Sequence, residues 1–172
     1  MTMDTLLPPE LFAAATRVVE ANRAAGRTIA LAESCSGGLV AAAITEVAGS
    51  SDVLVASVVT YSDEAKHVLL KVANDVLETF GAVSIATAWA MACGVLERSG
   101  ADVAVAITGI AGPGGGSEKK PVGTVVFARA EKGHEQADVH ADRKQFEDTG
   151  RAGVRLQATL CALELLMPPP AP

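Results

Sequence analysis

Aromatic residues are scarce in this chain of 172 residues, since Phe, Trp and Tyr together make up 3% of it. Because Ala, Val and Gly are plentiful instead, we expect an aliphatic core in which helices and strands pack closely. Acidic residues outnumber basic ones, 20 to 14, and the formal net charge is −6. A chain without a basic excess argues against broad contact with nucleic acid or an anionic membrane, and we expect neither partner.

Cysteine is rare as well. Cys35, Cys93 and Cys161 are an odd number of widely spaced residues without a Cys-x-x-Cys pair, which argues against a disulfide framework. No apolar run is long enough to span a membrane, and the first residues lack the pattern of a signal peptide. The histidines have neither the spacing nor the cysteine partners of a zinc site. We therefore expect a reduced, cytoplasmic protein that uses no metal and no cofactor.

What the sequence does contain is an alternation of helical and extended segments. Helices are expected at residues 11–25, 37–47, from 62 or 63 onward, 74–79, 84–98 and 150–167. Strands are expected at residues 28–32, 52–61, 102–108, 122–130 and 134–140, the last two forming a hairpin. The valine-rich run at 52–61 is typical of a strand covered on both faces.

This alternation predicts an α/β fold, a three-layer α/β/α sandwich with a mixed, mostly parallel sheet and a C-terminal helix. We expect one domain over residues 1–167 and a disordered tail at 168–172. Three polar stretches, at 33–38, 61–66 and 108–120, follow predicted strands. Ligands bind at the carboxyl ends of parallel strands, so these stretches are expected to converge on a site.

The first stretch offers Ser34 at a strand-to-helix junction, where backbone N–H groups suit an oxyanion or a phosphate. Gly37 and Gly38 would let the backbone approach a ligand closely. The alternative is that Ser34 or Ser36 only caps the following helix, and spacing alone favours it. Cys35 has no histidine placed to form a thiolate, so a small buried thiol beside the ligand suits it better.

The second stretch supplies a possible base. Lys66 would lie in the first turn of a helix, where the dipole and partial desolvation favour a neutral amine. Tyr61, at the end of the preceding strand, could relay a proton to a leaving group. The alternatives are a lysine that extends to solvent and a tyrosine at the rim of the sheet.

The third stretch is rich in glycine and matches neither the P-loop nor the dinucleotide-binding pattern. Its N–H groups could form an anion-binding concavity, with Thr108 contributing a hydroxyl, although a plain flexible loop has the same composition. Ser117 and Lys120 satisfy the Ser-x-x-Lys pattern of penicillin-binding proteins, but in a loop rather than at a helix start. We take that match as coincidence.

Together, "LAESCSGG", "GSSDVLVASVVTYSDEAK", "GAVS" and "DVAVAITGIAGPGGGSEKKPVGTVVFA" resemble the CinA C-terminal domain family, the nicotinamide-nucleotide amidohydrolases. The resemblance covers roughly residues 10 to 167. It implies hydrolysis of the carboxamide of nicotinamide mononucleotide, a small-molecule substrate, to nicotinate mononucleotide and ammonia. Some members carry a further N-terminal domain linked to competence and pyrophosphatase activity, for which we expect no room here.

Carried over from the family, Ser34 is the nucleophile, Lys66 the base and Tyr61 a further catalytic group. The resemblance also implies a polar group near the pocket at Ser51 and a substrate-binding loop, formed by Thr108, Gly109, Ile110, Ala111 and Gly112. We expect a homo-oligomer. A non-catalytic nucleotide-binding or regulatory module, related to competence or DNA damage, is the alternative.

The chain departs from the family pattern at three positions. Ser36 stands for a more usual threonine, Asp63 for a frequent asparagine, and Gly150 for the aspartate of a Gly-Asp-Arg-x-x-Val-Arg pattern. Arg151 and Arg155 of that pattern remain, four residues apart on one helix face. Because the net charge repels anions, an arginine is needed to hold a phosphate, and the family pattern favours Arg155.

Overall fold

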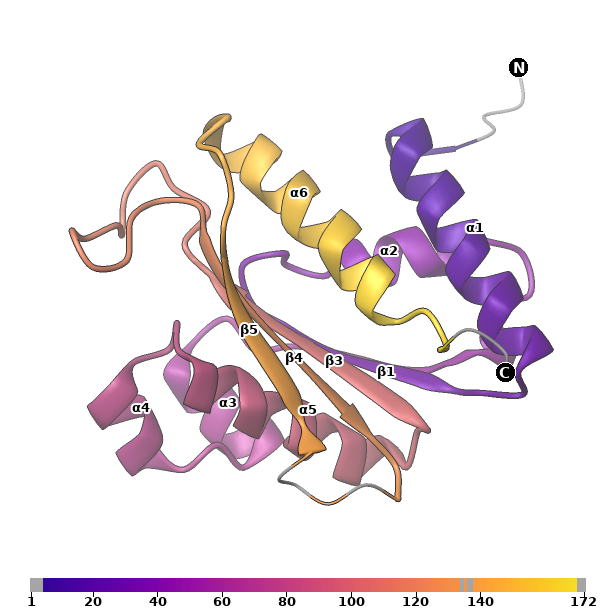
Figure 1. The fold of residues 1–172 in the computed structure, drawn as a ribbon, viewed down its shortest axis with the longest axis horizontal. Helices are drawn as coiled ribbons and strands as arrows, with labels where there is room; N and C mark the ends of the chain where they lie inside the picture. Colours follow the sequence, from indigo (N-terminus) through magenta and orange to yellow (C-terminus); the bar gives the residue numbers. More distant parts are fainter. Residues whose placement is uncertain (1–4, 134, 136–137, 170–172) are drawn as a thin grey trace.

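The computed structural model describes residues 5–133, 135 and 138–169. Five strands form one sheet in the order β2-β1-β3-β4-β5 (Figure 1). They are β1 (Ile29–Glu33), β2 (Leu54–Val59), β3 (Val103–Gly109), β4 (Thr124–Glu131) and β5 (His140–Gln145). β1 runs parallel to β2 and β3, whereas β4 runs antiparallel to both β3 and β5. All strands except β4 therefore share one direction, which confirms the mixed, mostly parallel sheet.

Helices cover both faces of the sheet (Figure 1). On one face lie α1 (Pro9–Ala24), α2 (Leu39–Thr45) and the C-terminal helix α6 (Gly150–Leu165). On the other lie α3 (Asp63–Leu70), α4 (Asn74–Phe80) and α5 (Ile85–Ser99). A short 3-10 helix, η1 (Ser50–Asp52), leads into β2. The three-layer sandwich is thus confirmed, and no helix in the described ranges is long and apolar enough to cross a membrane.

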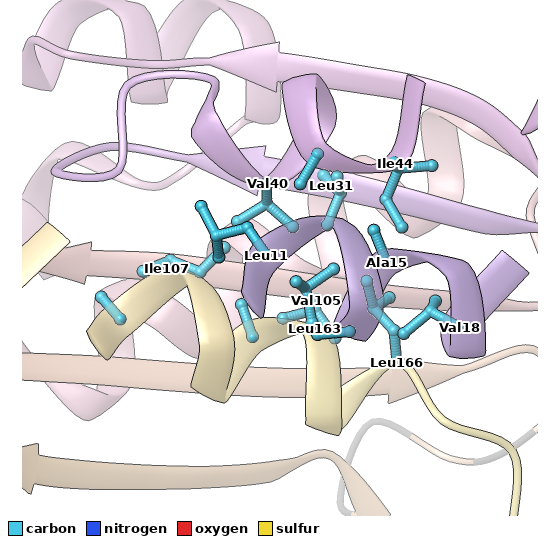
Figure 2. Packing of buried hydrophobic residues seen from close by; sticks show 14 of the residues in the cluster. Leu11, Ala15, Val18, Leu31, Val40, Ile44, Val105, Ile107, Leu163 and Leu166 are labelled. Atoms are coloured by element: carbon cyan, nitrogen blue, oxygen red, sulfur yellow. The ribbon is translucent and has the colours of Figure 1, made fainter. Parts of the chain in front are cut away.

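The core on the α1 side is aliphatic. Figure 2 shows side chains from α1, α2 and α6 meeting those of the central strands. Leu11, Val40 and Leu163 pack against Leu31 and Val105, and each of these five residues is at most 1% exposed. Each such side chain contributes about 1.5–3 kcal/mol when it is removed from water.

On the opposite face, small residues allow an unusually close approach between α5 and α3. Gly94 of α5 faces the backbone of Leu70, the last residue of α3. A Cβ at Gly94 would lie 2.9 Å from the carbonyl carbon of Leu70 and closer still to its oxygen. The two helices therefore touch through backbone atoms, a separation that only glycine permits.

The edge position of β2 contradicts one expectation. The valine-rich run was expected to be covered on both faces, yet β2 ends the sheet, and Val55 and Val59 are 49% and 44% exposed. β-branched composition indicates an extended backbone but does not report how many neighbours the strand has.

Several element boundaries also differ from expectation, among them the start of α2 and the position of the last strand. The helix expected from residue 37 begins at Leu39, because Gly37 and Gly38 adopt positive φ values of 63° and 91°. The strand expected at 134–140 begins at His140 instead and runs to Gln145. Residues 134, 136 and 137 of that expected strand, and residues 170–172 of the expected disordered tail, lie outside the described residues.

Candidate active site

Ser34 lies at the end of the buried central strand β1. Its backbone N–H donates to the carbonyl of Ile107 in β3 at 2.9 Å, which fixes the residue to the sheet. The N-cap position of α2 is occupied by Gly38, which has no side chain, so neither Ser34 nor Ser36 is the N-cap residue. The structure therefore excludes helix capping by Ser34 or Ser36, the alternative that spacing alone favoured.

Lys66 projects from α3 toward Ser34. Ser62 caps α3 by accepting from the N–H of Ala65 at 3.1 Å, which sets where the helix begins. The Lys66 Nζ lies 3.4 Å from the Ser34 Oγ and 2.9 Å from the carbonyl oxygen of Thr60. The first distance is longer than an ordinary hydrogen bond, as catalytic contacts often are before substrate tightens them.

The environment of Lys66 favours its neutral form. The residue is 1% exposed, which excludes a lysine that extends to solvent. Burial lowers the pKa of its amine from the ordinary value of 10.5, partly opposed by the negative charge of Asp63. An amine with a lowered pKa holds its lone pair available at a lower pH, so it can accept a proton from a hydroxyl.

A cavity of about 180 Å³ opens beside these two residues. It is lined by Ser34, Cys35, Tyr61, Lys66, Ala82, Val83, Thr108, Gly109, Ala111 and Arg151. All three polar stretches thus contribute, and they come from the carboxyl ends of β1, β2 and β3. Thr108 donates its hydroxyl proton to the carbonyl of Ala82 at 2.8 Å, so toward the cavity its oxygen can only accept a hydrogen bond.

Tyr61 and Arg151 form one wall of the cavity. The Arg151 Nη2 donates to the Tyr61 hydroxyl at 2.6 Å, and its Nη1 donates to the carbonyl of Gly112 at 2.8 Å. The Tyr61 hydroxyl therefore already accepts from a cation, which leaves its own proton free to be donated. Tyr61 is 60% exposed and lies at the rim of the sheet, and it also lines the cavity.

The cavity does not include Arg155. Its Nη2 donates to the carbonyl of Ser36 at 2.9 Å, and its guanidinium lies next to Gly37. Arg151, one turn earlier on α6, lines the cavity instead. The arginine placed to meet a ligand is therefore Arg151 rather than the expected Arg155.

Several other expected residues also lie outside the cavity lining. Ser51 is exposed in η1, before β2, whereas Tyr61 follows β2, so the two lie at opposite ends of the strand. Ser51 is therefore not part of this cavity lining, and its expected place near the pocket stays a prediction. Gly37 and Gly38 supply the left-handed backbone of the turn rather than a lining surface. Of the expected loop, Thr108, Gly109 and Ala111 line the cavity, whereas Ile110 and Gly112 do not.

Cys35 lines the cavity as an unreactive thiol. It is 6% exposed, and burial raises its pKa to about 11. A thiol with so high a pKa carries almost no thiolate near neutral pH, so Cys35 is poorly suited to act as a nucleophile.

Sequence reasoning missed Glu33, Ala82 and Val83. Ala82 and Val83 belong to the segment between α4 and α5, where nothing in their own chemistry signals a ligand. Glu33 carried a usable signal, because it is an acidic residue at the end of an otherwise apolar strand that is fully buried. Buried carboxylates are rare unless something holds them in place.

A larger hollow of about 570 Å³ lies between α5 and the β4–β5 connection, lined in part by Trp89, Cys93 and Gly133. Among the described residues its lining contains no serine or threonine, and burial raises the pKa of its Cys93 thiol. The smaller cavity is the candidate site because Ser34 and Lys66 meet there, not because of its size.

The family model of the CinA C-terminal domain matches residues 12–168. The chain belongs to this family. A solved CinA-type relative, the competence/damage inducible protein CihA from Agrobacterium tumefaciens, is 45% identical with a TM-score of 0.89, over 94% of this chain and 96% of that chain. A CinA superfamily protein from Klebsiella pneumoniae 700603 is 38% identical with a TM-score of 0.84, over 91% and 94% of the two chains.

Among CinA-related sequences, the nicotinamide-nucleotide amidohydrolase PncC of Enterobacter agglomerans is 50% identical over 83% of this chain and 84% of that protein. A CinA-like protein of Mycobacterium avium is 51% identical over 83% of this chain. The match spans only about a third (33%) of that longer relative. The CinA C-terminal domain is thus found both in proteins of about this size and within larger ones.

Proposed function

We propose that the chain hydrolyses the carboxamide of nicotinamide mononucleotide, giving nicotinate mononucleotide and ammonia. The observation that carries this proposal is the Ser34 Oγ at 3.4 Å from the amine of a fully buried lysine, inside a cavity. The name of the Enterobacter agglomerans relative supplies the substrate, a nicotinamide nucleotide.

The first half of the reaction forms an acyl-enzyme. Neutral Lys66 takes the Ser34 proton while Ser34 Oγ attacks the carboxamide carbon. The carbonyl oxygen becomes an oxyanion, which backbone N–H groups following Ser34 stabilise. Ammonia then leaves as the C–N bond breaks, with its proton supplied by Lys66 directly, or by the Tyr61 hydroxyl, which Lys66 reprotonates, so that Lys66 is neutral again.

In the second half, water attacks the acyl carbon and Lys66 takes its proton. The ester bond to Ser34 breaks, the carboxylic acid leaves, and the proton returns to Ser34 Oγ. The net reaction consumes one amide and one water and yields one acid and one ammonia. No metal or organic cofactor is needed for this balance.

The geometry also supports an orientation of the substrate. A cavity of about 180 Å³ suits the pyridine ring and its carboxamide rather than a whole nucleotide. The ribose phosphate then extends to the mouth, where Arg151 offers N–H groups beyond those bound to Tyr61 and Gly112. The Thr108 oxygen, which can only accept, suits the amide NH₂ and not the carboxylate of the product.

The test is ammonia release and product identification by mass spectrometry over a panel of pyridine nucleotides and their ribosides. We expect turnover of nicotinamide mononucleotide by the wild type and none above background by Ser34→Ala. Unchanged deamidation by Ser34→Ala would refute the nucleophile. Binding of the nucleotide without turnover by the wild type would instead favour a regulatory module.

A further inference from the structure

Glu33 is a fully buried carboxylate, 0% exposed, that immediately precedes Ser34. Five donors surround it. Its Oε2 accepts from the Ser36 hydroxyl at 2.7 Å and from the N–H groups of Gly38 and Val40 at 3.1 and 3.2 Å. Its Oε1 accepts from the N–H of Ala41 at 3.0 Å and from the Ser57 hydroxyl at 3.3 Å.

This carboxylate occupies the N-terminus of α2. The first N–H groups of a helix have no partner within the helix and attract anions. Here Glu33 already binds those of Gly38, Val40 and Ala41. The α2 N-terminus is therefore not open to a substrate phosphate.

Two N–H groups of the nucleophile turn remain. The N–H of Gly37 donates to the Ser34 carbonyl and that of Leu39 to the Ser36 carbonyl. Those of Cys35 and Ser36 have no oxygen acceptor among residues 5–133, 135 and 138–169, and they face the Cys35 sulfur, a weak acceptor whose pKa they lower. An N–H directly after a nucleophile is a usual donor to the oxyanion that forms there.

We propose that Glu33 is a positioning residue that sets the oxyanion site. By holding the Ser36 hydroxyl and the first turn of α2, it fixes the turn from Ser34 to Gly38 and leaves the N–H groups of Cys35 and Ser36 for the oxyanion. The proposal rests on the proposed function for its substrate, and it names the residue that prepares the site for the transition state.

Two serine variants separate positioning from general stability. Ser36→Ala and Ser57→Ala each remove one hydroxyl donor to Glu33, but only Ser36 belongs to the nucleophile turn. Glu33→Gln keeps the shape and loses the charge, and its NH₂ group opposes one of the N–H donors. Glu33→Ala would leave five donors without an acceptor and is expected to fold poorly, so it is not the deciding variant.

The first measurement is kcat and KM for nicotinamide mononucleotide, per folded molecule. We expect kcat to fall about tenfold in Ser36→Ala and in Glu33→Gln with KM within about twofold, because the oxyanion exists only after attack. Ser57→Ala is expected to change kcat less than about twofold, since the turn keeps its own bonds. Equal kcat in all variants, or an equal loss in both serine variants, would overturn the positioning role.

The second measurement does not depend on the amide substrate. A fluorophosphonate probe labels an activated serine when the serine oxygen attacks phosphorus, fluoride leaves and the lysine takes the proton. Intact-mass spectrometry then gives the rate of Ser34 labelling, which we expect to slow in Glu33→Gln and Ser36→Ala but not in Ser57→Ala. Labelled wild type without deamidation refutes the proposed substrate while these rates still decide the role of Glu33, and unlabelled wild type overturns both.

Discussion

A methyl group added at Gly94 of α5 is expected to disturb the site, although Gly94 does not line the cavity. Helix propensity alone predicts that Gly94→Ala stabilises α5 by about 1 kcal/mol. The structure predicts the opposite sign. The new Cβ would lie 2.9 Å from the carbonyl carbon of Leu70, and ordinary carbon contacts are about 3.5–4.0 Å.

The helices must therefore separate by roughly 1 Å, because backbone atoms on both sides cannot rotate away. Overpacking of this kind costs about 1–3 kcal/mol, which exceeds the gain in helix propensity. The displacement acts on α3, which carries Lys66 one turn before Leu70. A shift of this size between base and nucleophile can lower kcat by about 10–100-fold.

The assay combines urea unfolding with kcat for nicotinamide mononucleotide per folded molecule. Gly114→Ala is the matched control, because a Cβ there meets nothing within 4 Å and the φ of Gly114 is not positive. We expect it to leave both measurements near wild type. Wild-type stability and kcat in Gly94→Ala would refute the close-contact reasoning, and a loss of stability with intact kcat would refute only its link to Lys66.

Three further outcomes follow from the site. Lys66→Met is expected to lower kcat by about 10³-fold or more. It should also flatten the pH dependence of stability. The pKa of Lys66 in the folded protein lies below the ordinary value of 10.5, so between these two pH values the unfolded chain binds more protons than the folded one. The free energy of unfolding of the wild type therefore rises with pH over this range, which urea titrations would show. Arg151→Ala should raise KM for the mononucleotide about tenfold or more and change the riboside little, whereas Arg155→Ala should affect both alike; steady-state kinetics would show a reversed pattern if Arg155 held the phosphate. Cys35, with a pKa of about 11, should react with iodoacetamide only slowly at pH 8 and faster as the pH approaches 11, and rapid labelling at pH 7 by mass spectrometry would contradict its burial.

The succession of helices and strands along the chain could be predicted from the sequence, because hydrophobic periodicity and turn residues are local signals. The meeting of Ser34, Tyr61 and Lys66 was predicted by one further rule, that parallel strands present their carboxyl ends together. The place of Ser51 outside the cavity lining was not predicted, because sequence proximity to a motif does not show which end of β2 a residue occupies.

The choice between Arg151 and Arg155 could not be made from the sequence. Both lie on one face of α6, and which turn reaches the cavity depends on how far α6 is shifted along the sheet, a property of the whole packing. The five partners of Glu33 were equally hidden, since they come from the turn, from α2 and from β2. Long-range contacts of this kind appear only once the layers are assembled.

The contact between Arg151 and Tyr61 joins residues that are 90 positions apart. During synthesis, the nucleophile, the base and most of the sheet emerge from the ribosome well before α6 does. Until then the face of the sheet that α1 and α2 cover lacks its third helix, and the cavity lacks the wall to which Arg151 contributes. A nascent chain therefore holds Ser34 and Lys66 early but cannot form the complete substrate site, so the order of translation itself delays the proposed activity until the fold closes.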